Sequence, residues 1–271
     1  MSQRKGTAMV DEQPLPPLVA RMWGREPPTR RGPQPSLNLE RITAAAIAVA
    51  DAEGLSGVSM SNVAARLGVA PMSLYRYVGS KDELLAVMVE SAFENPPRLD
   101  GRSWRDYLTV WTRANRDALL ARPWMLPIAH LAPPIGPRSL RWLDRALAAL
   151  THTPLTEGEK VNAATTLSGY AFFQANLISG LSVGANQRER ARLTSVQEYG
   201  TTLAELLDSA DYPALAHAVD SGVFSASQDW VEDADFLFGL NLLLDGIAAL
   251  IARRSVDDEQ PNETSPRSDA P

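Results

Sequence analysis

Apolar side chains recur every three to four residues along most of the chain, and no segment shows the strict alternation that predicts a half-buried β-strand. The first such segment predicts a helix from about Leu39 to Glu53, with Ile42 and Ala46 on its apolar face. Asn38 is suited to cap this helix, and Gly54 is suited to end it. The pattern as a whole predicts an all-α fold.

Two shorter helical segments follow and are separated by a tight turn. The first, Met60–Leu67, begins after the potential N-cap Ser59 and ends at Gly68. The second, Pro71–Val78, begins with a proline, which loses no hydrogen bond in the first turn of a helix. Ala64 is small enough to let the two helices approach closely. This pattern is typical of a helix-turn-helix, although a helical hairpin with no role in DNA binding has the same features.

The next helix begins with a capping box, in which Ser80 caps the helix and Glu83 bonds back to the backbone. Lys81 lies in its first turn, where a cation opposes the helix dipole by a few tenths of a kcal/mol. A phosphate bound there would reverse the sign of this effect, because the ammonium and the backbone N–H groups would both point at it. The alternative is a solvated lysine.

Further helices are expected over Trp104–Ala121, Trp124–His130, Pro137–Leu150, from Thr156 to Gly180 or Gly184, over 196–209 and over Val231–Arg253. The last of these is apolar on nearly every side and must therefore be buried. Burial against a second copy of the chain is the simplest solution, with Leu240 and Leu244 in the interface. Two long helices from each chain would then form a four-helix dimer interface.

Both ends of the 271-residue chain differ from the rest in composition. Residues 1–36 are rich in proline and residues 254–271 are almost entirely polar, so both are expected to be disordered. This leaves two segments between them, residues 37–80 with the helix-turn-helix pattern and residues 81–253 with the longer predicted helices. The net charge is −6, and only the N-terminal arm is basic, with six Lys or Arg against three acids in residues 1–35. Arg30 and Arg31 of this arm are candidates to enter a minor groove.

The amino-acid composition excludes several kinds of functional site. The chain has no cysteine, which excludes disulfides, cysteine-ligated zinc and thiol catalysis. Its three histidines lie far apart without a carboxylate at ligand spacing, so neither a metal nor another cofactor is expected. The start of the chain is polar, and Asn241 and Asp245 interrupt the longest apolar run. A cytoplasmic protein without a membrane span is therefore expected.

The segment Gly57–Leu85 resembles the DNA-binding domain of the TetR/AcrR family of bacterial repressors. The matching residues are Ala64, Leu67, Gly68, Val69, Leu74, Tyr75, Tyr77, Lys81 and Leu84. Downstream, Asp235–Leu240 with Gly246 resembles the last helix of the tetracycline-repressor type of C-terminal domain, and Ser103, Trp104, Asp106 and Ala118–Leu120 resemble its fifth helix. The resemblance implies a helix-turn-helix three-helix domain followed by a helical ligand-binding and dimerisation domain. It further implies a homodimeric repressor that a small-molecule ligand releases from a palindromic double-stranded DNA operator.

The same resemblance places a set of side chains at the DNA. Pro71 and Met72 suit thymine methyl groups, and Arg76 suits a guanine or a phosphate. Ser61 stands where relatives often have a longer base-reading residue, so its contact stays open. The remaining expected contacts, three of them suited to phosphates, are Ser73, Tyr75, Tyr77 and Lys81.

Aromatic and polar residues share faces of the regulatory helices, as a small-molecule site requires. The candidates are Trp111, Trp124, Tyr170 and Phe173 as apolar surface, with Asn115, His130 and Gln174 as polar groups. They predict a largely apolar ligand held without metal, although such residues also serve simply as core. The drug and magnesium ligands of tetracycline repressors are not reproduced, since Trp111 replaces a polar residue, Asn115 an aromatic one and Pro96-Pro97 a histidine.

Two other functions are compatible with parts of the sequence. Residues 180–184 fit the G-x-S-x-G pattern of a hydrolase nucleophile, with Ser182 at its centre. That pattern requires a strand before the serine, and a long helix is predicted there instead. A DNA-binding module that responds to no ligand is the other alternative. A gel shift with the DNA upstream of the protein's own gene would distinguish a regulator from a hydrolase.

Overall fold

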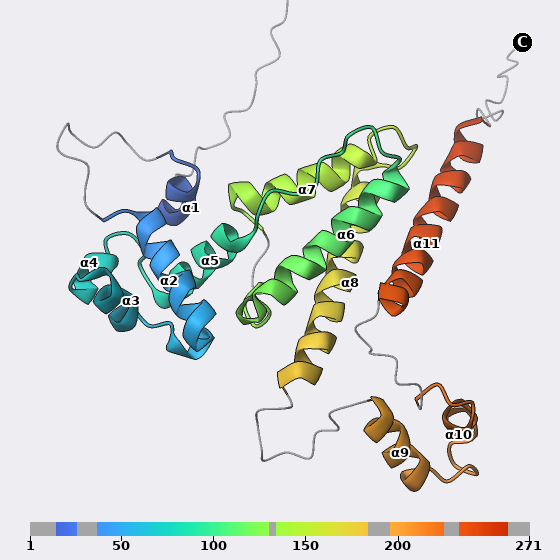
Figure 1. The fold of residues 1–271 in the computed structure, drawn as a ribbon. Helices are drawn as coiled ribbons and strands as arrows, with labels where there is room; N and C mark the ends of the chain where they lie inside the picture. Colours follow the sequence, from blue (N-terminus) through green and yellow to red (C-terminus); the bar gives the residue numbers. More distant parts are fainter. Residues whose placement is uncertain (1–14, 26–36, 130–133, 184–195, 225–232, 260–271) are drawn as a thin grey trace, which may run out of the picture. The chain divides into compact units, whose positions relative to one another are not determined.

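The computed structural model describes residues 15–25, 37–129, 134–183, 196–224 and 233–259, and these residues form helices, turns and loops without a β-strand (Figure 1). The chain divides into two compact units. The first comprises Met1–Glu94 and Pro127–Leu140, and the second comprises Asn95–Leu126 and Arg141–Pro271. The predicted all-α fold class is confirmed for the described residues.

The first unit contains a bundle of short helices. Helix α2 packs against both α3 and α5, and α3 packs against α4. Ile42 of α2, Val63 of α3, Leu74 of α4 and Leu84 of α5 are fully buried between them. The elements are α1 (Pro17–Met22), α2 (Leu39–Glu53), the 3-10 turn η1 (Leu55–Gly57), α3 (Met60–Leu67), α4 (Pro71–Leu74) and α5 (Lys81–Ala92).

The capping residues define these helices as the sequence predicts. The side chains of Asn38, Ser59 and Ser80 accept hydrogen bonds from the first-turn N–H groups of α2, α3 and α5. Helix α4 is shorter than expected, because it ends at Leu74 rather than at Val78. Residues up to Val78 form one further turn, and the N-cap of α5 follows soon after.

The first unit also differs from the predicted domain limits. Residues 17–22 form α1 with Leu18 buried, although the sequence predicts no regular structure anywhere in 1–36. The signal for this helix is Pro17 at its first position, which the proline-rich surroundings conceal. Helix α5 belongs to the first unit, which extends to Glu94. Arg30 and Arg31 lie outside the described residues.

The second unit is built on three long helices. Helices α6 and α8 lie side by side, and α11 packs against α8 (Figure 1). This unit differs from the prediction in three places. Helix α11 continues beyond the predicted end at Arg253, and the segment after Ala121 forms only a short 3-10 turn. The sequence analysis predicts no helix where α10 lies. The elements are α6 (Trp104–Ala121), η2 (Pro123–Met125), α7 (Pro137–Ala149, which begins in the first unit), α8 (Glu157–Val183), α9 (Val196–Leu206), α10 (Pro213–Asp220) and α11 (Asp233–Glu259).

Candidate DNA interface and regulatory site

The turn between α3 and α4 has the geometry of a helix-turn-helix. Gly68 adopts the left-handed conformation, with φ 69° and ψ 31°, which costs a residue with a Cβ about 1 kcal/mol or more. The N–H groups of Gly68 and Val69 bond to the carbonyl groups of Ala65 and Ala64, which closes α3. Ala64 is fully buried at this approach. The turn therefore directs α4 away from α3 at a fixed angle.

Helix α4 and the turn after it present a divided surface. Leu74 and Val78 are fully buried and fix the segment to the core. On the opposite side, Met72 is 73% exposed and Tyr75 is 44% exposed. The other predicted contacts on this segment divide in the same way, since Pro71 and Arg76 are exposed whereas Ser73 and Tyr77 are half-buried. Large apolar side chains that water surrounds in the free protein are suited to contacts with base edges.

The starts of α3 and α5 flank this surface in the sequence. Ser61 is exposed in the first turn of α3, where Asn62 beside it bonds back to the carbonyl of Gly57 at 2.9 Å. Lys81 is exposed at the first position of α5. Glu83 accepts a hydrogen bond from the N–H of residue 79 at 2.7 Å, so its carboxylate reaches one residue before the N-cap. The N-terminal turn of α5 is thus held in place, with Lys81 exposed to solvent.

A buried carboxylate joins the end of α5 to the start of α7. Glu90 is 8% exposed and accepts hydrogen bonds from Arg138 N–H and from the Ser139 hydroxyl, the latter at 2.7 Å. In return, the Arg138 guanidinium donates to the carbonyl groups of Ser91 and Phe93 at 2.8 and 3.2 Å. A Cβ at residue 136 would collide with the Glu90 side chain. The two helix ends therefore satisfy each other's unpaired backbone groups.

In the second unit, Trp111 and Asn115 lie one turn apart on the buried face of α6. Trp111 Nε1 donates to the carbonyl of Trp142 at 3.0 Å, and the two indole rings pack with centroids 5.9 Å apart. Trp124 in η2 is also buried, at 7% exposure. Trp111, Asn115 and Trp124, three of the predicted ligand residues, therefore lie in the interior of the unit.

Tyr170 and Gln174 of α8 take part in the packing of α11. The Tyr170 hydroxyl donates to the Phe236 carbonyl at 2.9 Å and accepts from Gln174 Nε2 at 3.1 Å. The rings of Tyr170 and Phe236 stack with centroids 5.5 Å apart. Burial raises the pKa of the Tyr170 phenol, although the hydrogen bond from Gln174 acts in the opposite direction. Gly239 leaves room for this hydroxyl, which a Cβ would displace.

The sequence prediction misses a buried cation in the same region. Arg116 is 7% exposed, and its guanidinium carbon lies 4.1 Å from the centre of the Phe236 ring. Its Nη2 also pairs with Asp117 at 2.8 Å. The helical period places residue 116 on the same buried face as Leu108 and Thr112, but its charge argues against burial.

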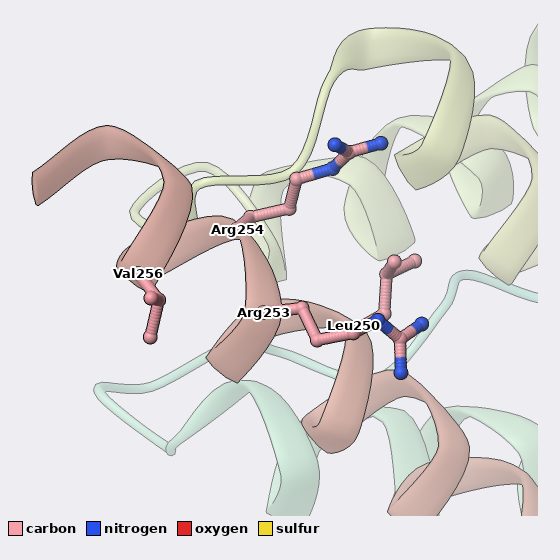
Figure 2. A pocket seen from close by; sticks show the side chains of 4 residues that line it. All are labelled: Leu250, Arg253, Arg254 and Val256. Carbon is pink, nitrogen blue, oxygen red and sulfur yellow. The ribbon is translucent and has the colours of Figure 1, made fainter. Parts of the chain in front are cut away.

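Of the other two predicted ligand residues, Phe173 does not lie in this interior. Phe173 is 60% exposed on α8, so it faces away from the core of its own chain. His130 lies outside the described residues. A depression of about 420 Å³ lies elsewhere, on the last turns of α11, and contains none of the predicted ligand residues (Figure 2). Its lining residues are Leu250, Arg253, Arg254 and Val256.

One residue of this depression joins two long helices. Arg254 of α11 pairs with Glu159 in the first turn of α8, with Nη2 and Oε1 2.6 Å apart. This hydrogen bond, together with one from the Thr156 backbone, lowers the pKa of Glu159 to about 2. Thr156 and Glu159 also form a capping box at the start of α8.

Helix α11 has two apolar faces with different environments. Phe236, Leu240 and Leu244 are buried within the chain, so the expectation that Leu240 and Leu244 meet a second copy is wrong. Phe238 and Leu242 on the other side are 68% and 59% exposed. A helix that is apolar all round shows no such division in its sequence, because either stripe could face the chain's own core.

Within the described ranges, one stretch is long and apolar enough to cross a membrane, namely Ala234–Val256 in α11, with a mean hydropathy of 1.8. Asn241 and Asp245 therefore do not exclude a span by composition, contrary to the sequence prediction. Both side chains instead hold Arg105 of α6, whose Nη2 lies 2.6 Å from Asp245 Oδ1. The polar interruptions thus connect α11 to its own helical unit.

The hydrolase alternative is not supported. Residue 182 lies within the backbone of α8, which runs to Val183, and no strand precedes it in the described part of the chain. A nucleophile elbow needs a strand-to-helix turn at this point.

A helix-turn-helix followed by a unit of long packed helices defines a class of DNA-binding transcriptional regulators. The chain matches the model for bacterial regulatory proteins of the tetR family over residues 42–88, and the tetracyclin repressor-like C-terminal domain over residues 96–251. The chain belongs to the tetR family, and it is therefore a transcriptional regulator rather than an enzyme.

Relatives and solved structures agree with this membership. The chain is 35% identical to the transcriptional repressor DrrR1 of Streptomyces coeruleorubidus, over 86% of this chain and 85% of that protein. It is 29% identical to the class A tetracycline repressor from transposon 1721 of Escherichia coli, over 76% of this chain and 88% of that protein. The TetR family protein ActR of Streptomyces coelicolor, solved in complex with actinorhodin, has a TM-score of 0.65 and 26% identity, covering 79% of this chain and 97% of ActR.

Proposed function

We propose that the chain is a homodimeric repressor that binds a palindromic operator and is released from it by a small molecule. The observation that carries this proposal is the divided surface of α4. Its buried residues fix the helix, while Met72, Tyr75 and Arg76 are exposed to solvent. Each copy would insert this surface into a major groove, with the two half-sites about 34–36 Å apart.

The DNA contacts follow from the chemistry of the exposed side chains. Met72 and Pro71 contact thymine methyl groups, Arg76 binds a guanine or a phosphate, and Lys81 binds a phosphate at the start of α5. The further proposed contacts are Ser61, Ser73, Tyr75 and Tyr77, together with Arg30 and Arg31 of the N-terminal arm.

The exposed faces of α8 and α11 support dimerisation. Phe173 on α8 and Phe238 and Leu242 on α11 are large apolar side chains that water surrounds in the single chain. Gly246 on α11 has open space around its missing Cβ, which allows another helix to approach closely. Burial of these faces between two copies would also explain why α11 is so apolar for a protein that works on DNA in the cytoplasm.

The regulatory ligand is proposed to be largely apolar and aromatic. Trp111, Asn115 and Trp124 offer a buried aromatic surface with one amide, and Tyr170 and Gln174 lie on the adjacent helix α8. ActR, a protein of similar fold, is solved with the organic ligand actinorhodin. Actinorhodin is therefore the first probe to test on this chain.

The proposal is tested with a duplex that the wild-type protein selects from a random pool. We expect a gel shift on this duplex, reversal of the shift by a ligand that also quenches tryptophan fluorescence, and no shift on a scrambled duplex. Trp111→Phe should change the ligand concentration needed for release while leaving operator affinity unchanged. A shift that no tested ligand reverses, from actinorhodin onward, would favour the ligand-independent module.

A further inference from the structure

The helix α1 lies outside the part of the chain that the family model covers, which begins at residue 42. It nevertheless packs within the first unit, because Leu18 is only 9% exposed. Gly24 follows the helix with φ 61°, a conformation that favours glycine, and its N–H bonds to the Arg21 carbonyl at the end of the helix. A helix packed in this unit can contact α4 and the turn after it, and can thereby influence how they are positioned for DNA binding.

We call helix α4, together with the turn that follows it to Val78, the recognition segment. The first contact of α1 is with the end of this segment. Arg21 Nη1 donates a hydrogen bond to the carbonyl of Tyr77. The Tyr77 N–H bonds in turn to the Leu74 carbonyl at 2.8 Å, which makes Tyr77 part of the turn that extends α4. A cation at the last carbonyl groups of a helical segment is electrostatically favourable. Arg21 therefore fixes the end of the segment that carries Tyr75.

The second contact of α1 reaches the segment that begins α7. Trp23 Nε1 donates to the carbonyl of Ile135 at 2.9 Å, and Ile135 lies two residues before the first residue of α7. The Arg25 guanidinium lies 5.8 Å from the centre of the Trp23 ring. Glu90 holds the next part of this segment through Ser139. The start of α7 is thus connected to α1 as well as to α5.

We propose that α1 is a brace for DNA binding, in which Arg21 and Trp23 are positioning residues that act on the recognition segment through Tyr77. Arg21 holds the end of this segment, and Trp23 holds α1 at the start of α7. This inference rests on the proposed use of α4 at the operator.

The test compares Arg21→Ala, Arg21→Lys, Trp23→Phe and the charge-matched control Arg41→Ala, at an exposed position of α2, in the full chain. Affinity is measured for the selected operator duplex and for a scrambled duplex at several salt concentrations. We expect Arg21→Ala to weaken operator binding by about tenfold or more, as for the loss of one hydrogen bond from a charged group. Trp23→Phe keeps an aromatic ring but removes the donor, and should weaken operator binding about threefold. Combining the two should add little, because both act through one element.

A brace affects the reading of bases, so binding to the scrambled duplex and the salt slope should stay unchanged, and Arg21→Lys should restore part of the affinity. The proposal is overturned if Arg21→Ala and Trp23→Phe bind the operator as the wild type does. It is also overturned if Arg21→Ala weakens both duplexes equally and lowers the salt slope by about one, which would make Arg21 a phosphate contact. An equal effect of Arg41→Ala would overturn it as well, since general electrostatics would then explain the loss. If the wild type itself preferred no duplex, the proposed function would fail rather than the brace.

Discussion

At the scale of single residues, the exposed and buried side chains of α4 and of the turn after it serve different purposes. Leu74 and Val78 hold the segment in the core, while Met72, Tyr75 and Arg76 are exposed and able to meet DNA. Arg76 is the most informative of these, because a guanidinium can bind either a guanine edge or a phosphate. The two contacts have different consequences for specificity.

Arg76→Ala should weaken binding to the selected operator by about 1–3 kcal/mol if Arg76 reads a base. The loss should then be confined to sequences that carry the base in question. Fluorescence anisotropy on the operator and on duplexes substituted one base pair at a time measures this pattern. Equal weakening on every sequence would identify a phosphate contact, and no weakening would refute the placement of Arg76 at the DNA.

Glu159 provides a pH-dependent test of the junction between α8 and α11. Its pKa falls from a usual value near 4.5 to about 2, chiefly through Arg254. A lowered pKa in the folded state adds stability above the unfolded pKa, and this stability is lost as the pH falls through the folded pKa. The difference in unfolding free energy between wild type and Glu159→Gln should therefore be full above about pH 5 and shrink towards pH 2.

Urea unfolding at a series of pH values measures this difference. In an Arg254→Gln background the pH-dependent part should be smaller, because the hydrogen bonds from Thr156 then hold the carboxylate without the guanidinium. A difference that stays constant from about pH 5 to about pH 2 would contradict the assigned ion pair.

At the scale of elements, the local signals for the start and end of each helix are sufficient to predict most of the fold. Asn38, Ser59 and Ser80 cap the helices that the sequence assigns to them, and Ser103 caps α6 in the same way. The helix α1 escapes prediction, because so short a helix, stabilised by tertiary contacts, has little local signal of its own. The partition of α11 into an inner and an outer face is also beyond prediction, since both faces are apolar.

The candidate site is predictable to a similar extent. The exposed surface of α4 follows from the helix-turn-helix pattern, whereas the burial of Arg116 depends on the Phe236 ring, which is 120 residues away in the chain. Likewise, the exposure of Phe173 does not follow from its spacing, which suits a core position as well as an interface. Whether such a residue is buried or exposed thus depends on contacts between distant segments, which the local sequence pattern does not show.

The turn between α3 and α4 gives a matched pair of glycine substitutions. Gly68→Ala should destabilise the protein by about 1 kcal/mol, because alanine has to adopt the left-handed conformation. Gly158→Ala in the first turn of α8 meets open space and should be neutral or stabilising by up to about 1 kcal/mol. Denaturant unfolding of both variants measures the contrast. Equal effects of the two substitutions would contradict the turn geometry.

At the scale of the whole molecule, the proposed function depends on two copies that present two recognition helices together. The exposed side chains Phe238 and Leu242 predict where the second copy binds, in place of the buried Leu240 and Leu244. Substitution of the buried pair would destabilise a single chain and could not report on dimerisation. Substitution of the exposed pair, Phe238 and Leu242, can change dimerisation without changing the folding of the single chain.

Phe238→Glu and Leu242→Glu should each give a folded monomer, because a charge in an apolar interface is costly whereas the chain's own core is untouched. Val110→Glu on α6, where the side chain is 38% exposed, is the matched control and should stay dimeric. Sedimentation velocity and circular dichroism measure assembly and folding separately. Variants that remain dimeric would show that this face of α11 lies outside the interface.

The most direct test of the account is the mass of the complex between the protein and its selected operator duplex, measured by native mass spectrometry. Two chains on one duplex are predicted, with the complex lost when one half-site is scrambled or when Leu242→Glu replaces the wild type. A complex of one chain with one duplex, unaffected by the loss of a half-site, would contradict a dimeric regulator that reads DNA with paired recognition helices.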